Sequence, residues 1–277
     1  TSPLKRAGFF MKNFLIILVF LTSCSLPNGN QRLEIIKAYN GSEFTEKIYR
    51  TPYFEIYSLN KIKNLEKVIV YIEGDGVSWI DRNTISSDPT PIDPLAFSLA
   101  KIDQNDNVIY LARPCQYIQA SNCNNKDIWT VSQYSETVLS SYKAIIDSLS
   151  QFKEIHIVGY SGGAGIAMYL GSSNNEKINS IRTVAGNINH NEFTRLRNFT
   201  APKKSVDFFL VEKNIRNISQ VHYFGKKDRV IPKDLHENYY IRNKDSPCIK
   251  IKEVNASHNE GWTEFWKANH NIIPVCN

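Results

Sequence analysis

The sequence has no internal repeat, no long low-complexity linker and no cysteine and histidine spacing typical of a zinc site. Its 33 lysines and arginines are scattered along the chain rather than gathered, which argues against a nucleic-acid groove. The most apolar run, residues 14–21, is too short to span a bilayer. We therefore expect no repeat array, no metal or other cofactor, and no nucleic acid as partner.

The chain does contain enough apolar material for a full core, because 42% of its 277 residues are hydrophobic. Strand-like segments alternate with helix-like segments from residue 68 to the end, as in a mostly parallel sheet with helices on both faces. We expect an α/β fold in a single domain at residues 24–277, preceded by a separate segment at residues 1–23.

Hydrophobic periodicity and turn residues predict the main elements. Strands are expected at residues 67–72, 154–158, 220–224 and 249–254, with an early strand at 53–59 and a further candidate at 31–39. Helices are expected at residues 131–150, 166–170 and 259–270. Residues 187–219 connect two expected strands over a short distance, so any cap over the site should be small.

One short motif lies between an expected strand and an expected helix. Residues 159–163 read Gly-Tyr-Ser-Gly-Gly and fit the G-x-S-x-G nucleophile elbow, in which a sharp turn lifts the Ser161 hydroxyl out of the sheet. Glycines allow a turn in which larger residues would clash, and the free N–H groups of the next helix favour negative charge. A glycine-rich turn with an incidental serine is the alternative, but the flanking elements favour the elbow.

A nucleophilic serine needs a base and an acid, and in folds with this elbow the chain order is serine, acid, histidine. Asp228 follows the expected strand at 220–224, and His258 follows the strand at 249–254. Taken singly, each could be an ordinary loop residue. Together they follow strand ends, where open α/β sheets place their chemistry. We predict Ser161 as nucleophile, His258 as base and Asp228 as the acid that orients the imidazole.

Two other histidines are rival bases. His222 lies inside an expected strand, where a buried structural role is more common. His190 follows a strand end and could line the pocket. The order of the triad favours His258 over both.

These motifs resemble the α/β-hydrolase superfamily. The chain is most similar to a group of exported bacterial hydrolases that combine this elbow with Tyr-Ile-Glu-Gly-Asp-Gly at residues 71–76 and Arg-Pro-Cys-Gln-Tyr at residues 113–117. The similarity extends from about residue 68 to residue 262. It implies the α/β-hydrolase fold and serine hydrolase activity.

The resemblance also implies an oxyanion hole. One donor should be the backbone N–H of Gly162, and a second normally comes from the loop after the strand at 67–72. Many relatives have His-Gly where this chain has Glu73 and Gly74, which leaves the second donor open; alignment favours the backbone N–H of Asp75. Its carboxylate should face away, because it would repel the oxyanion. A plain β-turn is the alternative for this loop.

The N-terminal residues resemble a secretory signal, with Lys12, the apolar run at 14–21 and small residues before Cys24. Residues 21–24, Leu-Thr-Ser-Cys, resemble the bacterial lipobox, whose cysteine is lipidated. We expect an exported lipoprotein that Cys24 anchors to a membrane of the cell envelope, at the outer membrane or the periplasmic face. An ordinary cleaved signal with an incidental cysteine is the alternative.

The remaining cysteines are even in number, as expected in an oxidising compartment. Three pairings are possible. We favour a disulfide between Cys115 and Cys123, near the active face, and one between Cys248 and Cys276, at the C-terminus. Unpaired buried thiols are the alternative.

Together these features predict a serine hydrolase that cleaves carboxylic esters, either small molecules or lipids, through an acyl-enzyme. Thioesterase or peptidase activity on the same triad is the nearest alternative. A non-catalytic surface lipoprotein that binds a partner is a further alternative, because a fold alone does not prove activity.

Overall fold

The computed structural model describes residues 27–173, 176–200 and 202–276. The expected signal segment and Cys24 lie outside these residues. The helices are α1 (Gly29–Asn40), α2 (Leu95–Ile102), α3 (Glu136–Asp147), α4 (Gly163–Ser172), α5 (His190–Arg197), α6 (Phe208–Asn214), α7 (Lys233–Asn243) and α8 (Trp262–Asn269). The strands are β1 (Thr45–Arg50), β2 (Glu55–Lys61), β3 (Lys67–Ile72), β4 (Val108–Leu111), β5 (Glu154–Tyr160), β6 (Ile178–Val184), β7 (Ser219–Gly225) and β8 (Ile249–Val254). Across the described ranges, no helix is both long and apolar enough to cross a membrane.

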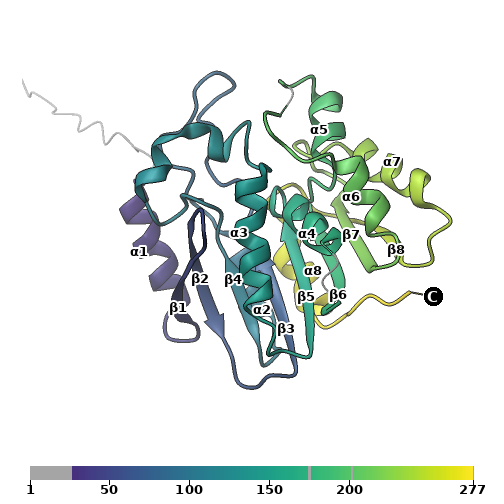
Figure 1. Ribbon diagram of the computed structural model, residues 1–277, viewed down its shortest axis with the longest axis horizontal. Helices are drawn as coiled ribbons and strands as arrows, with labels where there is room; N and C mark the ends of the chain where they lie inside the picture. Colours follow the sequence, from purple (N-terminus) through teal and green to yellow (C-terminus); the bar gives the residue numbers. More distant parts are fainter. Residues whose placement is uncertain (1–26, 174–175, 201, 277) are drawn as a thin grey trace, which may run out of the picture.

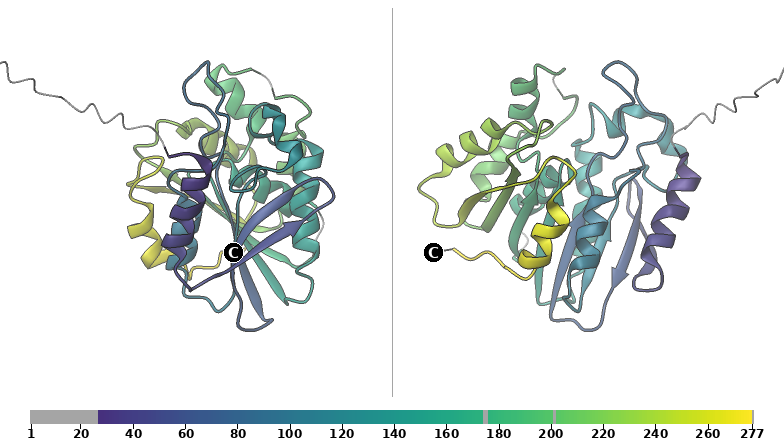
Figure 2. Two further views of the ribbon diagram at one scale, coloured as in Figure 1. Left: turned by 90° about the vertical axis from the view of Figure 1, so that its left-hand side faces the viewer. Right: turned by 180° about the vertical axis from the view of Figure 1, so that it is seen from behind.

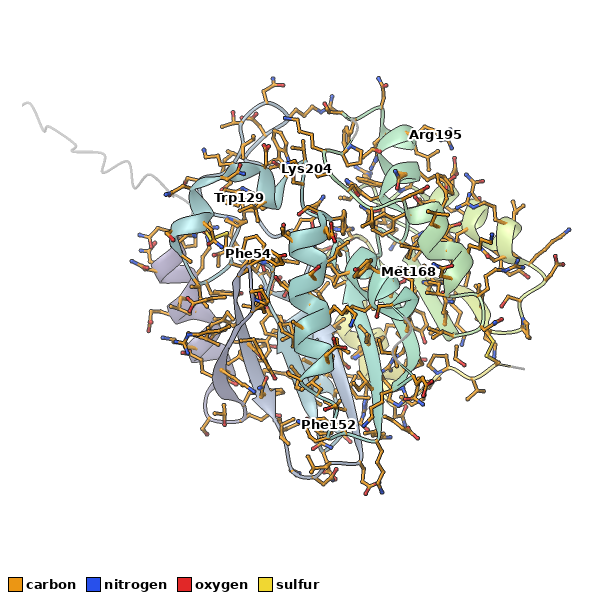
Figure 3. The ribbon with its side chains drawn as sticks, viewed as in Figure 1. Phe54, Trp129, Phe152, Met168, Arg195 and Lys204 are labelled. Atoms are coloured by element: carbon orange, nitrogen blue, oxygen red, sulfur yellow. A yellow bond between two sulfur atoms is a disulfide. The ribbon has the colours of Figure 1, made fainter. Side chains whose placement is uncertain are left out.

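The strands form an 8-stranded sheet in the order β1-β2-β4-β3-β5-β6-β7-β8 (Figure 1). Strands β3 to β8 pair in parallel, whereas β2 is antiparallel to both β1 and β4. In Figure 3, Phe152 lies at the amino end of β5, while Trp129, Arg195 and Lys204 lie toward the opposite edge. Because parallel strands end at one edge, the loops after β3, β5, β7 and β8 meet there.

Helices cover both faces of the sheet, as the sequence predicts. Along β3, Val68, Val70 and Ile72 belong to one apolar cluster, and the intervening Ile69 and Tyr71 belong to another, which is the two-residue period of a strand. Helices α3, α4, α6 and α7 pack into the first cluster. Helices α1, α2 and α8 pack into the second, on the face seen from behind in Figure 2. Two cores thus hold the central strands on both faces.

One expected strand is a helix. Residues 31–39 lie within α1, which begins with a capping box: Asn28 accepts a hydrogen bond from the N–H of Gln31, and the Gln31 side chain accepts one from the N–H of Asn28. Ile36 and Asn40 are buried one helical turn apart, and Ile36 belongs to the second apolar cluster. The strand prediction is wrong because Asn28 and Gln31 start a helix here, and the weak apolar periodicity of residues 31–39 does not reveal it.

Two expected helices begin later than the sequence indicates. The helix expected at 131–150 is α3, because Ser135 is still extended and forms its N-cap. The helix expected at 259–270 is α8, which starts only after Gly261, whose φ of +87° is not helical. Residues 187–219 contain the short helices α5 and α6.

The structure pairs Cys115 with Cys123 and Cys248 with Cys276, the two pairings favoured above. The first disulfide closes part of the loop after β4, and the second joins the start of β8 to the C-terminal segment. Because disulfides persist mainly in oxidising compartments, the two bridges indicate a non-cytoplasmic location.

The close approach of α4 to β3 can be tested at Gly163, the first residue of α4. A Cβ there would lie 2.3 Å from the carbonyl oxygen of Ile72 and 2.6 Å from that of Glu73. Backbone atoms cannot swing aside, so we expect Gly163→Ala to lower the free energy of unfolding by about 2 kcal/mol, as measured by thermal or urea denaturation.

Gly171→Ala is the matched control in the same helix. Its new Cβ would approach closely only the flexible end of the Ile181 side chain (2.4 Å), with the side chains of Ile215 and Ile218 at 3.4 Å and 3.5 Å, and alanine favours a helix more than glycine does. We expect this variant to be as stable as the wild type or more so. Equal stability of Gly163→Ala and Gly171→Ala would contradict the described packing of α4 on β3.

Candidate active site

Ser161 lies at the turn between β5 and α4, where its φ is +48°. This left-handed conformation is strained in a residue with a side chain and is typical of a nucleophile elbow. Gly159 permits the turn, because a Cβ there would lie 2.5 Å from the carbonyl oxygen of Gly163. The carbonyl oxygen of Ser161 accepts hydrogen bonds from the N–H groups of Ala164 (3.1 Å) and Asn187 (2.9 Å). The turn is therefore held by backbone contacts on both sides.

The structure brings the three predicted triad residues together in the predicted order of contacts. The Oγ of Ser161 lies 3.0 Å from Nε2 of His258. The Nδ1 of His258 lies 2.9 Å from Oδ2 of Asp228. A carboxylate can only accept, so the proton of the neutral imidazole lies on Nδ1 and Nε2 is free to accept from the serine hydroxyl. This is the arrangement needed to take a proton from Ser161.

Asp228 is held as a carboxylate. Its side chain is only 2% exposed, and its Oδ1 accepts hydrogen bonds from the N–H groups of Val230 (2.7 Å) and Ile231 (3.0 Å). Burial by itself raises the pKa of Asp228, but the hydrogen bond and charge of His258 and these two N–H groups outweigh it, so the pKa lies below its ordinary value. The negative charge therefore persists at neutral pH and can stabilise an imidazolium.

The loop that carries His258 is anchored in the second apolar cluster. The carbonyl oxygen of His258 accepts a hydrogen bond from the indole N–H of Trp262 (3.1 Å), whose side chain is completely buried. The hydroxyl of Tyr160 bonds the same carbonyl (3.3 Å) and the side chain of Asn259 (2.6 Å). Because β7 and β8 are neighbours, the loops with Asp228 and His258 leave the sheet side by side.

The loop after β3 lies directly against the elbow. A Cβ at Gly74 would lie 3.0 Å from the Cβ of Ser161, closer than ordinary van der Waals contact, so a larger residue there would have to displace its neighbours. The expected oxyanion donors, the N–H groups of Gly162 and Asp75, therefore belong to two segments that touch beside the nucleophile. Among the described residues, the N–H groups of Gly162 and Asp75 make no backbone hydrogen bond other than any within the regular helices and strands.

The prediction that the Asp75 carboxylate faces away from the oxyanion is wrong, because this carboxylate lies against the elbow. A Cβ placed on Gly162 would lie 1.9 Å from Oδ1 of Asp75, so the carboxylate faces the elbow. Arg113 compensates the charge through a 2.9 Å ion pair in which the arginine side chain is 5% exposed. Burial raises the pKa of Asp75, and the charge of Arg113 limits that rise. Reorienting the amide of Gln133 lets it donate to Asp75 as well.

Glu73, which replaces the histidine of the His-Gly pattern, is a buried acid. Its Oε1 accepts hydrogen bonds from the N–H groups of Gly74 (2.9 Å) and Ala96 (3.4 Å). Burial raises the pKa of Glu73 to about 7, and those N–H groups oppose the rise. The Glu73 side chain therefore supports the loop after β3, and it stays protonated up to near-neutral pH.

Neither rival histidine contacts Ser161 through its side chain. His222 is buried in β7, with Nδ1 bonded to Thr183 and Nε2 bonded to Gln220. His190 is buried at the start of α5, with Nδ1 bonded to the side chain of Asn187. Burial lowers the pKa of each to about 3. Both stay neutral and structural.

A cavity of about 720 Å³ lies next to the triad, between the loops that follow β7 and β8. Most of the residues around it are polar or charged, but they line it largely with apolar atoms: Lys226, Lys227, Asp228, Arg229, Val230, Ser257, His258, Asn259 and Glu260. Among the described residues, no three histidine, cysteine or acidic side chains gather as metal ligands would. The site therefore offers a nucleophile and a base beside an accessible cavity.

No known family model and no curated protein matches the sequence. Solved structures do match the fold. An esterase from Pyrococcus furiosus, Pf2001, is 16% identical and superposes with a TM-score of 0.57 over 84% of this chain and 92% of that one. Est1E from Butyrivibrio proteoclasticus is 11% identical, with a TM-score of 0.55 over 80% of this chain and 96% of that one. An α/β serine hydrolase homologue from Coxiella burnetii is 13% identical, with a TM-score of 0.50 over 81% and 96%.

The fold is therefore that of the α/β hydrolases. The mostly parallel sheet, the helices on both faces and the strand-to-helix turn at Ser161 agree with this assignment. At these levels of identity the likeness establishes the fold, and the reaction has to be argued from the residues at the site.

The buried acid gives a testable pH dependence. The folded pKa of Glu73, about 7, lies above the value of 4.5 for an exposed glutamate, so the folded state retains a proton that the unfolded chain has released in this window. Stability should therefore fall as the pH rises from about 5 to about 8, by at most roughly 3 kcal/mol. Glu73→Gln keeps the acceptor for Gly74 and should remove that part of the pH dependence, as measured by urea denaturation.

The control is Glu66→Gln, at an acid that is 66% exposed. This variant should retain the wild-type pH dependence. If Glu73→Gln and the wild type lose stability in parallel over the same pH range, the buried acid does not titrate as described.

Proposed function

We propose that this protein is a serine hydrolase that cleaves carboxylic esters through an acyl-enzyme. The hydrogen-bonded chain from Ser161 through His258 to Asp228, with contacts of 3.0 Å and 2.9 Å, is the observation that supports it. Such a chain has few structural reasons to exist at an accessible sheet edge, because its serine is strained and its histidine contributes little to the core.

In the first half of the reaction, Ser161 Oγ attacks the ester carbonyl carbon while His258 Nε2 takes the hydroxyl proton. The carbonyl oxygen becomes an oxyanion, which the N–H groups of Gly162 and Asp75 stabilise, each by roughly 3 kcal/mol. The positive end of α4 points at the same place and adds to this stabilisation. Asp228 stabilises the imidazolium that forms.

In the second half, the imidazolium of His258 gives its proton to the leaving alcohol oxygen, and the bond from carbon to that oxygen breaks. Water then attacks the acyl-enzyme with His258 as base, and Ser161 is regenerated as the acid leaves. No step needs a cofactor, since protons move only between Ser161, His258, water and the oxygen of the leaving alcohol.

Esters are preferred over thioesters and amides as the proposed substrates. Two of the similar solved structures are named esterases, and the described residues between 187 and 219 form two short helices rather than a large specificity cap. The open cavity beside His258 suits a substrate whose alcohol part remains in contact with water. Thioester or peptide hydrolysis on the same triad would use the same steps.

We also propose export and membrane anchoring through a lipid on Cys24. The lipobox-like residues before that cysteine support this proposal, and the two disulfides agree with a destination outside the cytoplasm. The partners would then be an ester substrate and the membrane that holds the anchor.

A fluorophosphonate probe tests the nucleophile directly, because it reacts covalently with activated serines. We expect the purified protein to be labelled and Ser161→Ala to be unlabelled. Ser172→Ala, at the far end of α4, is the matched control and should label normally. Absence of labelling in the folded wild type would favour a non-catalytic binding protein on the same fold.

The base is tested by comparing histidine variants. His258→Ala should lower kcat for a p-nitrophenyl ester by roughly 1,000-fold or more, because the proton of Ser161 then has no acceptor. His190→Ala and His222→Ala should retain most of kcat, after correction for any loss of stability. Normal turnover by His258→Ala together with collapse of His190→Ala would reverse the assignment.

A further inference from the structure

The Arg-Pro-Cys-Gln-Tyr segment at residues 113–117 takes no part in the proton transfers, yet its backbone is strained. Cys115 and Tyr117 both have positive φ, at +66° and +63°. Such conformations cost energy in residues with side chains and persist only where the surroundings impose them. Within this segment, Cys115 packs with its disulfide partner Cys123 and with Trp129 (labelled in Figure 3) in a small apolar cluster. The segment is built to keep one shape.

The fixed backbone of this segment places the Gln116 side chain against the loop after β3. It is 1% exposed. Its Nε2 donates to the carbonyl oxygens of Gly74 (3.0 Å) and Pro89 (3.3 Å), and its Oε1 accepts from the N–H of Arg113 (2.9 Å). A backbone carbonyl can only accept and a backbone N–H can only donate, so the orientation of this amide is unambiguous.

The contact with Gly74 controls the next N–H group. The carbonyl of Gly74 and the N–H of Asp75 belong to one peptide unit, which is planar and trans, so the two groups point in opposite directions. A hydrogen bond to the Gly74 oxygen therefore fixes the direction in which the Asp75 N–H points.

The other oxyanion donor is held in the same manner but by backbone alone. The N–H of Gly162 shares a peptide unit with the carbonyl of Ser161, whose oxygen accepts from the N–H groups of Ala164 and Asn187. The two donor peptides thus differ in one respect: only the Asp75 donor depends on a side chain far away in the sequence.

The loop needs such support because glycines flank Asp75. Gly74 and Gly76 have wide backbone freedom, and Gly76 has φ +59°. The ion pair from Arg113 to the Asp75 carboxylate holds the same residue from its side chain. From one short segment, Gln116 therefore binds the Gly74 carbonyl and Arg113 binds the Asp75 carboxylate.

We propose that Gln116 is a positioning residue of the oxyanion hole: by holding the Gly74 carbonyl, it aims the Asp75 N–H at the ester carbonyl oxygen. This inference rests on the acyl transfer proposed above. It gives the Arg-Pro-Cys-Gln-Tyr segment a role in transition-state stabilisation that is separate from the triad.

The test compares an ester with its thiono analogue, in which sulfur replaces the carbonyl oxygen. Sulfur is a weak hydrogen-bond acceptor, so a well-aimed N–H favours the oxygen ester more than the sulfur ester. Gln116→Met should lower kcat/KM for the oxygen ester by roughly 10-fold to 100-fold, mainly through kcat, and lower it much less for the thiono ester. The ratio of the two kcat/KM values should shrink accordingly.

Gln119→Met is the matched control. Gln119 lies in the same disulfide-closed loop and donates to the carbonyl of Cys115 (3.1 Å), but it does not contact the loop after β3. This variant should keep the wild-type ratio. Gln116→Glu is the second variant; it keeps the shape and the acceptor for Arg113 but replaces the Nε2 donor, so it should also shrink the ratio even if Gln116→Met folds poorly.

The outcomes separate the two proposals. A folded wild type that turns over neither ester and resists the fluorophosphonate would reject the hydrolase proposal itself. A wild type that prefers the oxygen ester, with Gln116→Met and Gln116→Glu slowing both esters equally, would reject the positioning role alone and leave Gln116 as a structural residue.

Discussion

The loop after β3 and the elbow after β5 pack very closely at the carboxyl ends of their strands, and the site depends on that contact. Additional Cβ atoms at Gly74 and Gly163 would lie 3.0 Å from Ser161 Cβ and 2.3 Å from the Ile72 carbonyl oxygen, respectively. Dense packing transmits small displacements, so a shift at either strand end would move both the serine and the loop opposite it. The parallel pairing of β3 with β5 sets this contact before any catalytic side chain is considered.

The parallel sheet also explains how residues distant in sequence form a triad. Strands β5, β6, β7 and β8 are successive neighbours, and each returns through a helix to the same edge. Asp228 and His258 need only follow their strands to come within hydrogen-bonding distance. Two contacts fix the positions of these side chains: the buried Trp262 holds the loop that carries His258, and backbone N–H groups hold the carboxylate of Asp228. Good geometry at such a site requires a rigid supporting layer as much as the reacting groups.

Much of the fold could be predicted from the sequence, since the elbow and the strands before Asp228 and His258 carry strong local patterns. The helix α1 was missed because its hydrophobic pattern is weak, although the capping residues Asn28 and Gln31 indicated a helix start. The approach of the Asp75 carboxylate to Gly162 could not be foreseen, because the compensating charge comes from a loop 38 residues away. The Gln116 contact was equally hidden, since sequence patterns do not give the direction of a peptide plane.

The disulfide between Cys248 and Cys276, with a sequence separation of 28, encloses β8, His258 and α8 in one covalent ring. Closing a ring of that size removes chain entropy worth about 4 kcal/mol from the unfolded state in the simplest polymer treatment. The same closure limits partial opening. If the C-terminal tail frays, α8 and the loop with His258 cannot unfold one after the other from that end, because the disulfide ties the tail to the start of β8. The base is thereby kept within reach of its serine during the local fluctuations that chain ends ordinarily undergo.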